Sequence, residues 1–361
     1  MSKRTKEIIA VVLSVAIILG TLSVADRILR EKSEDGITQC AAMYDQPRDT
    51  VDVVMLGSSH VHYGINTATL WKNYGIAAYD YSSAEQPLWI SYYYLKEFCK
   101  YQKPKVVVLD FFSPAAFLDN YKSKYYFTDD QIYGFKFSMN KLFMMNAAFD
   151  GKIENWDKYF PSFFGYHDRY DKLEAEDFSS FGKDNSSFKG YVPLFHNAKV
   201  SAPVIENDEK LAPSDKSVKY LKKIIDYTND HDIELYITIV PYSVNIPQQE
   251  GLVQQEEARF NWLVDYIESL DDNENIHFDY TIKHVHDFGI DFENGTDIAD
   301  GNSHLNYYGS IKFSEYLGED LRNAYGISLL PDHRGEEAYS SWDEHVKIVE
   351  NKVLEADWEV R

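Results

Sequence analysis

The sequence predicts an α/β protein in which a parallel sheet of five strands lies between two layers of helices, as a three-layer sandwich. Short apolar runs alternate along the chain with amphipathic helical segments, which is typical of units that build a parallel sheet. The runs are apolar on both faces, as expected for strands covered by helices on both sides. The chain has 361 residues, of which 44% are hydrophobic and 15% aromatic, enough to form a large core.

Five apolar runs predict the strands. They lie at residues 51–56, 77–83, 105–112, 233–242 and 275–280. Between them, residues with helical spacing predict a helix that ends at Gly75 and another that begins at Pro87. Further helices are expected at 217–231, around 260–267, and at 306–326.

Residues 8–25 form an uncharged and mostly apolar run preceded by basic residues. As a helix this run measures about 27 Å, which is enough to cross the apolar core of a bilayer. We therefore predict a single-pass anchor in the cell membrane, with residues 1–7 in the cytoplasm and the remaining domain outside the cytoplasm. The alternative is a cleaved signal, because residues 23–25 resemble a small-residue processing site.

The rest of the chain divides into three parts. Residues 26–50 are polar and are predicted to be a tether or short helix, and residues 51–328 form the α/β domain. Residues 113–213 are an insertion after the third strand, rich in Tyr, Phe and Asp. Residues 329–361 form an acidic, partly helical tail with a narrow apolar stripe of Trp342, Val346, Val349 and Val353. We expect the stripe to pack on its own domain, with a partner site as the alternative.

The formal net charge of -22 argues against several classes of partner. It excludes a nucleic-acid-binding protein, because no basic surface neutralises phosphates, and it disfavours a domain lying on an anionic membrane surface. Cys40 and Cys99 give neither a disulfide framework nor a metal-ligand spacing. His60 and His62 lack a Cys or Glu at metal spacing, and the acidic residues between positions 291 and 300 lack the order of a calcium loop. We expect no metal.

Two loops carry the residues that predict catalysis. The first strand ends in Gly57-Ser58-Ser59, where Ser59 stands at the carboxyl edge of the sheet, the edge at which open α/β sheets bind ligands. His304 lies in a polar loop before the last helix, and Asp300 precedes it by four residues. A serine hydroxyl needs a base to remove its proton, and the imidazole needs an acid to orient it. We therefore predict Ser59 as nucleophile, His304 as base and Asp300 as orienting acid. Asp297 is the reserve acid, and a capped strand-to-helix turn is the structural alternative.

These residues resemble the SGNH/GDSL hydrolases. Gly57-Ser58-Ser59 is similar to the first block of that family, and Asp300 to His304 is similar to its last block. "GSSHVHYGIN" with "SHLNYYG" resembles in particular a membrane-anchored bacterial branch that includes D-alanyl-lipoteichoic acid and alginate-type O-acetylation proteins. The resemblance implies a flavodoxin-like parallel sheet, activity on cell-surface polymers without a cofactor, and a multi-spanning membrane acyltransferase as partner.

The sequence departs from the family in its oxyanion blocks. The family uses the N–H of the nucleophile, a glycine after the second strand and an asparagine after the third. Here the second strand is followed by "SSAEQP" and the third ends in "LDFFSP". We therefore expect backbone N–H groups of Ser59 and of the turn at Ser82 and Ser83 to hold the oxyanion.

Substrate contacts are predicted beside the nucleophile and in the insertion. His60 follows Ser59 directly, and is predicted to pack the turn or contact substrate. His167, Arg169 and Tyr170 lie among aromatic residues of the insertion, and aromatic rings with an arginine suit sugar or phosphate groups.

The sequence thus predicts an extracytoplasmic serine esterase or O-acyltransferase acting on acyl groups of a cell-surface polysaccharide or glycopolymer. Its partners would be a cell-surface glycan or acyl donor and a multi-spanning membrane acyltransferase. The alternative is a non-catalytic, membrane-anchored polymer-binding or scaffold protein of the same fold. A short distance between the Ser59 hydroxyl and a His304 ring nitrogen distinguishes the two.

Overall fold

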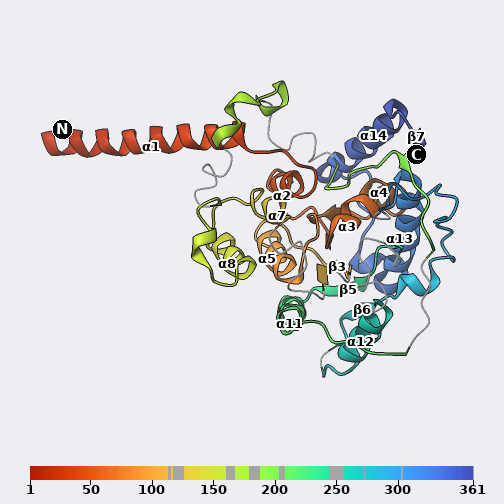
Figure 1. Cartoon of the computed structure of the whole chain (residues 1–361). Helices are drawn as coiled ribbons and strands as arrows, with labels where there is room; N and C mark the ends of the chain where they lie inside the picture. The colour runs from red at the N-terminus through yellow and green to blue at the C-terminus, as the bar shows by residue number, and fades with distance from the viewer. Residues whose placement is uncertain are drawn as a thin grey trace.

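The protein is described by a computed structural model. The structure describes residues 1–112, 115–116, 126–159, 167–178, 188–202, 208–243, 256–271, 273–301 and 304–360. Figure 1 shows an α/β domain from which one long helix extends.

The main sheet has five parallel strands in the order β2-β1-β3-β5-β6. The strands are β1 (Val53–Leu56), β2 (Ala78–Asp80), β3 (Val106–Asp110), β5 (Glu234–Thr238) and β6 (Ile276–Phe278). Val53 is in register with Ala78 on one side and with Val106 on the other, so β1 lies inside the sheet. The five predicted strands are confirmed, each shorter than its apolar run.

Helices cover both faces of this sheet. The principal helices of the domain are α3 (Ser59–Gly64), α4 (Thr67–Tyr74), α5 (Leu88–Phe98), α7 (Thr128–Ile132), α8 (Met139–Ala148), α11 (Asp215–Asp230), α12 (Glu256–Glu268), α13 (Tyr307–Leu329) and α14 (Ser340–Glu355). Val53 and Met55 pack toward α3, α4 and α13, whereas Val54 and Leu56 pack toward α5, α11 and α12. This alternation follows from the period of two in a strand and gives the predicted three layers.

The predicted helix boundaries follow local chemistry. Gly75 ends α4 with φ +66°, a left-handed conformation that glycine adopts at low cost. Pro87 is the N-cap of α5, and Asn66 caps α4 by accepting a hydrogen bond from the N–H of Thr69. The insertion carries α7, α8, short 3₁₀ turns at Ile153–Asn155, His167–Asp171 and Ala175–Phe178, and strand β4 (His196–Asn197). A further 3₁₀ turn lies at Thr281–His284.

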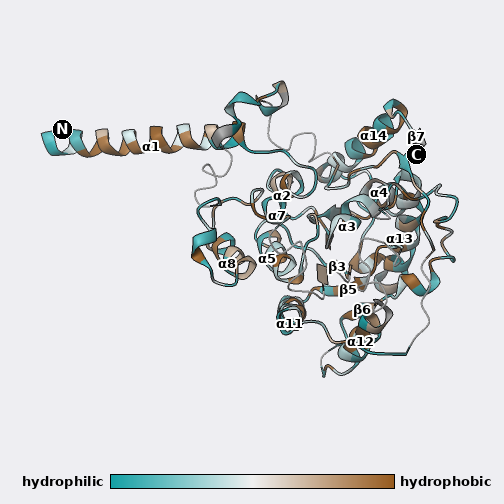
Figure 2. Cartoon of the chain, in the orientation of Figure 1, coloured by the Kyte–Doolittle hydropathy of each residue, from teal (hydrophilic) through white to brown (hydrophobic). Residues whose placement is uncertain are grey.

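The N-terminal helix α1 (Lys3–Leu29) is the one helix in the described ranges long and apolar enough to cross a membrane. No residue of its apolar window is buried by the rest of the molecule. Figure 2 shows that the helix is apolar over most of its length and hydrophilic at its N-terminus. The helix extends the predicted run 8–25 at both ends.

The segment 26–50 does not behave as a free tether. It contains α2 (Ile37–Met43), and all seven residues of this helix are buried. Tyr79 of β2 donates a hydrogen bond from its hydroxyl to the carbonyl of Gln39, at 2.8 Å. The chain therefore enters the core within a few residues of the end of α1, and of the two predicted alternatives, a tether or a short helix, the structure has the short helix.

The C-terminal tail packs on its own domain, as predicted. It contains a 3₁₀ turn at Glu337–Tyr339, helix α14 and strand β7 (Glu359–Val360), which pairs with β4 in a second, two-stranded parallel sheet. Trp342 and Val349 of the apolar stripe are buried, whereas Val346 and Val353 are half-buried. Neither β4 nor β7 was predicted, because a two-residue strand has no periodicity.

Candidate active site

The nucleophile candidate lies where β1 turns into α3. Ser58 is the N-cap of α3, and its Oγ accepts a hydrogen bond from the N–H of His60, at 3.3 Å. A side chain at Gly57 would place its Cβ 2.7 Å from the Cβ of Asp110 on the neighbouring strand β3. Glycine is therefore required for the close approach that turns the chain and places Ser59 at the first position of the helix.

Ser59, His304 and Asp300 come together at the carboxyl edge of the sheet. The Ser59 Oγ lies 2.8 Å from the His304 Nε2, and the His304 Nδ1 lies 2.8 Å from an Asp300 carboxylate oxygen. The loop that carries His304 is held by a bridge between Ile298 and Leu305, and the N–H of Ala299 donates to the carbonyl of His304 at 2.7 Å. These three residues are the ones that the sequence predicted to meet.

The hydrogen bonds assign the protons. The ionised carboxylate of Asp300 only accepts, so the Nδ1 of a neutral His304 carries the hydrogen, and its Nε2 accepts from the Ser59 hydroxyl. The reserve acid Asp297 does not take part, since its carboxylate accepts from the Lys312 ammonium and from the N–H of Asp291, both at 2.6 Å. The arrangement can remove a proton from a serine hydroxyl and return it to a leaving group.

The three oxyanion candidates differ in their backbone contacts. The N–H of Ser83 donates to the carbonyl of Gly57 at 3.4 Å. Within the described part of the chain, the N–H groups of Ser59 and Ser82 have no protein acceptor. The N–H groups of Ser59 and Ser82 are therefore the better donors for a developing oxyanion, and the N–H of Ser83 is the weaker candidate.

The two histidines that follow Ser59 are buried. His60 is 3% exposed and stacks on Phe112 with a ring-centroid distance of 4.4 Å, and it also lies 4.7 Å from the His304 ring. This is the packing role, and it leaves His60 little surface for a substrate. His62 is fully buried, and its Nδ1 lies 3.0 Å from the Oγ of Ser82.

Asp35 is a site residue that the sequence did not predict. The Tyr63 hydroxyl donates to the Asp35 carboxylate at 2.5 Å, and the His62 Nε2 lies 3.7 Å from the same oxygen. The nearby His62 ring and the Tyr63 hydroxyl outweigh partial burial and lower the pKa of Asp35 to about 2. The Tyr63 ring in turn meets the His304 ring edge-on, at 5.0 Å between centroids. No local motif could have revealed this contact, since Asp35 belongs to the polar segment between α1 and the α/β domain.

Asp110 ends β3 directly below the nucleophile turn. Its carboxylate accepts from the N–H of Val240 at 2.9 Å and from the Ser58 hydroxyl at 3.4 Å. The side chain is buried, and burial raises the pKa of Asp110 to about 7. The group therefore titrates in the neutral range beside the turn that presents Ser59.

We expect Asp110→Asn to remove part of the pH dependence of stability. An unfolded aspartate ionises near 3.8, whereas the buried carboxyl keeps its proton up to about 7. The contribution of Asp110 to the free energy of unfolding therefore falls as the pH rises from about 4 to about 7, by at most about 4 kcal/mol in total. It is constant at higher pH. Urea unfolding of the full chain at pH 5 and pH 8 measures it. The difference in unfolding free energy between wild type and variant should change by about 2–3 kcal/mol between these two pH values, and the exposed Asp208→Asn should show no such change. A difference that is the same at both pH values would contradict the assignment.

Arg169, one of the insertion residues proposed for substrate binding, contacts the end of α1. Arg169 donates to the carbonyl of Leu29 at 2.7 Å, at the end of α1, and lies 3.4 Å from the carboxylate of Asp177. In the structure Arg169 therefore holds the end of α1, and its role in substrate binding stays a prediction. Tyr170 is 73% exposed, and the side chain of His167 lies outside the described residues.

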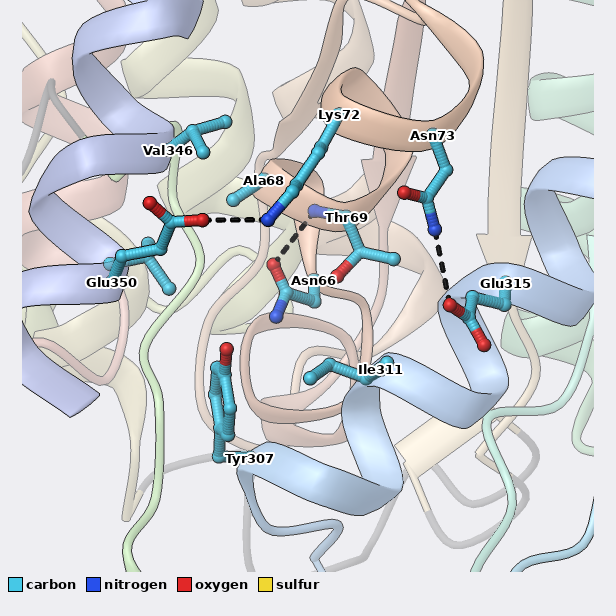
Figure 3. Close-up of a pocket in the computed structure, with 11 residues that line it drawn as sticks. Asn66, Ala68, Thr69, Lys72, Asn73, Tyr307, Ile311, Glu315, Val346 and Glu350 are labelled. Atoms are coloured by element: carbon cyan, nitrogen blue, oxygen red, sulfur yellow. Dashed lines mark hydrogen bonds and ion pairs between the residues drawn. The ribbon is translucent and has the colours of Figure 1, made fainter. Parts of the chain in front are cut away.

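A hollow of about 140 Å³ lies between α4, α13 and α14, and none of the triad residues lines it. Figure 3 shows Lys72 of α4 directed toward Glu350 of α14, and Asn73 toward Glu315 of α13. Lys72 and Glu350 form an ion pair at 2.7 Å. The hollow is a seam left where the tail helix docks and is separate from the candidate active site.

No known family model matches this sequence, and no curated protein is significantly similar to it. Among the described residues, no group of three or more His, Cys, Asp or Glu side chains has an arrangement that could hold a metal ion.

Proposed function

We propose that this protein is an SGNH-type serine esterase or O-acyltransferase that acts outside the cytoplasm on acyl groups of a cell-surface polysaccharide or glycopolymer. The observation that carries the proposal is the chain of two 2.8 Å contacts from the Ser59 hydroxyl through His304 to Asp300. A serine, a histidine and an acid linked in this order are the parts of a nucleophilic acyl-transfer site.

The reaction follows from the protons assigned above. The Ser59 Oγ attacks the acyl carbonyl carbon while His304 Nε2 takes the hydroxyl proton, and the N–H groups of Ser59 and Ser82 receive the oxyanion. When the intermediate collapses, the leaving alcohol takes the proton from His304, and the acyl group stays on Ser59. A water or a sugar hydroxyl then attacks the acyl-serine, gives its proton to His304, and frees Ser59.

Two features of the fold support this type of enzyme. Counted within the main sheet alone, the strands follow the order 2-1-3-4-5, which is the flavodoxin-like order implied by the SGNH resemblance. The apolar helix α1 supports a single-pass location in the cell membrane, with the domain outside. A multi-spanning acyltransferase in the same membrane is the proposed source of the acyl group.

The choice between hydrolysis and transfer depends on the second attacking group. Because the oxyanion blocks of the sequence differ from the family pattern, we expect slow turnover of a small acetyl ester by the full chain in detergent. Adding an oligosaccharide should shift the product from acetate to acetylated sugar, since both routes share the acyl-Ser59 intermediate. Mass spectrometry of the oligosaccharide and of the Ser59 peptide measures this.

Each alternative has its own result in that experiment. Fast release of acetate, with no acetylated sugar at any oligosaccharide concentration, would make the protein a plain esterase. Absence of both turnover and acyl-enzyme, even with the membrane partner present, would favour a polymer-binding or scaffold protein.

A further inference from the structure

We infer that Asp35 is a positioning residue that acts on both sides of the nucleophile. On one side it holds His62, which contacts Ser82, and on the other it holds Tyr63, which contacts the His304 ring. The inference rests on the proposed function, because the groups held in place are the proposed base and oxyanion donor. It also gives the segment between anchor and domain a part in the chemistry.

The first branch runs from Asp35 to the oxyanion side. Burial lowers the pKa of His62, so its ring is neutral and has one N–H and one acceptor nitrogen. The Asp35 carboxylate lies 3.7 Å from the Nε2, beyond the length of a hydrogen bond, and its negative charge favours a hydrogen on this nitrogen rather than a lone pair. The Nδ1 is then left to accept from the Ser82 hydroxyl at 3.0 Å. Because the Ser82 hydroxyl donates to His62, the side chain of Ser82 is held in one orientation. Its backbone N–H remains available to an oxyanion.

The second branch runs from Asp35 to the base. Burial raises the pKa of Tyr63, so the phenol keeps its proton and donates to Asp35 at 2.5 Å. The ring of Tyr63 stands edge-on to His304, with an interplanar angle of 68°. This contact limits rotation of the imidazole, which also lies 4.7 Å from the His60 ring. Fixing Tyr63 therefore helps keep the His304 Nε2 directed at Ser59.

The backbone holds Asp35 against the same turn. The N–H of Ala84 donates to the Asp35 carbonyl at 2.6 Å. Gly36 has φ +143°, and a Cβ at this position would lie 2.5 Å from the Cβ of Ser83. The strand-end turn and the segment after α1 are thus in direct backbone contact. Asp35 follows the last residue of α1, Leu29, by only six residues. The segment 30–35 is therefore held by α1 at one end and by the contacts of Asp35 at the other.

The experiment compares Asp35→Asn, Asp35→Glu and Glu34→Gln in the full chain in detergent. Glu34→Gln is the matched control, because it removes the same charge one position away. We expect Asp35→Asn to lower kcat for p-nitrophenyl acetate, and the rate of inactivation by a fluorophosphonate, by about 10- to 100-fold. This loss is smaller than the removal of an oxyanion donor, because the donor is displaced rather than deleted. KM and the midpoint of thermal unfolding should stay near wild type, and Asp35→Glu should recover part of kcat.

Two results would overturn the inference. One is an Asp35→Asn variant with the kcat and inactivation rate of wild type, and the other is a loss of kcat equal to that in Glu34→Gln. A third measurement is independent of turnover: ¹⁵N shifts of the His62 imidazole should report Nε2 protonated in wild type and a mixed tautomer in Asp35→Ala. Protonated Nδ1 in wild type would also refute the inference. A wild type that neither reacts nor labels would instead count against the proposed function, and the tautomer would still decide the role of Asp35.

Discussion

Ser59→Ala should abolish covalent labelling by a fluorophosphonate and lower ester turnover by at least about 10⁴-fold, because removing the nucleophile of a serine–histidine–acid site costs this much or more. The Ser59 Oγ is the atom that lies 2.8 Å from the His304 Nε2. Gel fluorescence of the labelled full chain, together with initial rates on a small acetyl ester, measures both losses.

The neighbouring serine supplies the control. The Oγ of Ser58 caps α3, accepting from the N–H of His60, and it also donates to Asp110. Ser58→Ala should therefore cost about 1 kcal/mol of stability through the lost cap and keep most labelling and turnover. Equal loss in both variants, or in neither, would show that Ser59 is not the nucleophile.

Trp342→Ala should destabilise the domain by about 3–5 kcal/mol, the usual cost of deleting a large buried aromatic side chain. Trp342 is fully buried, and its ring lies 5.9 Å from that of Trp71 on α4. Its Nε1 donates to the carbonyl of Ala78 on β2 at 3.3 Å, and the Lys189 ammonium lies 3.8 Å from the ring centroid. The substitution therefore leaves a cavity, an unmatched carbonyl and a buried lysine amine without its aromatic partner. Differential scanning fluorimetry should show a fall in the unfolding midpoint of roughly 5–15 °C.

Leu354→Ala is the matched control for the tail, because Leu354 lies on the same helix α14 and is 83% exposed. It should shift the midpoint by no more than about 1–2 °C, since exposed substitutions cost little. A similarly small shift in Trp342→Ala would mean that the tail contributes little to the stability of the domain.

The sheet and the triad were predictable because both depend on local patterns combined with one topological rule. A run such as residues 105–112 is short, mostly apolar and bounded by Pro104 and Pro114, so it identifies a buried strand without any long-range information. Parallel strands place all their carboxyl ends at one edge, so Ser59 and His304 could be expected to meet although they lie far apart in the chain.

The roles of Asp35 and Arg169 were not predictable, because each is defined by a partner distant in sequence. Asp35 lies in a polar stretch that resembles a linker, and only the fold shows that Tyr63 donates to it. Arg169 lies among aromatic residues, which suggested a sugar site, yet its guanidinium donates to the carbonyl of Leu29, 140 residues earlier. Polar contacts of this kind leave no periodicity in the sequence.

Under the proposed function, the 245 positions from Ser59 to His304 determine when the chain can first react. At about 5–20 residues per second, the ribosome needs roughly 12–50 s to synthesise the residues between them. During that time the serine hydroxyl has no imidazole to take its proton and remains a weak nucleophile. Helix α1 leaves the ribosome at the beginning of this interval, so the hydroxyl becomes reactive only long after α1 has emerged. Under the proposed function, an acyl ester that meets the chain before His304 is in place is therefore not attacked by Ser59.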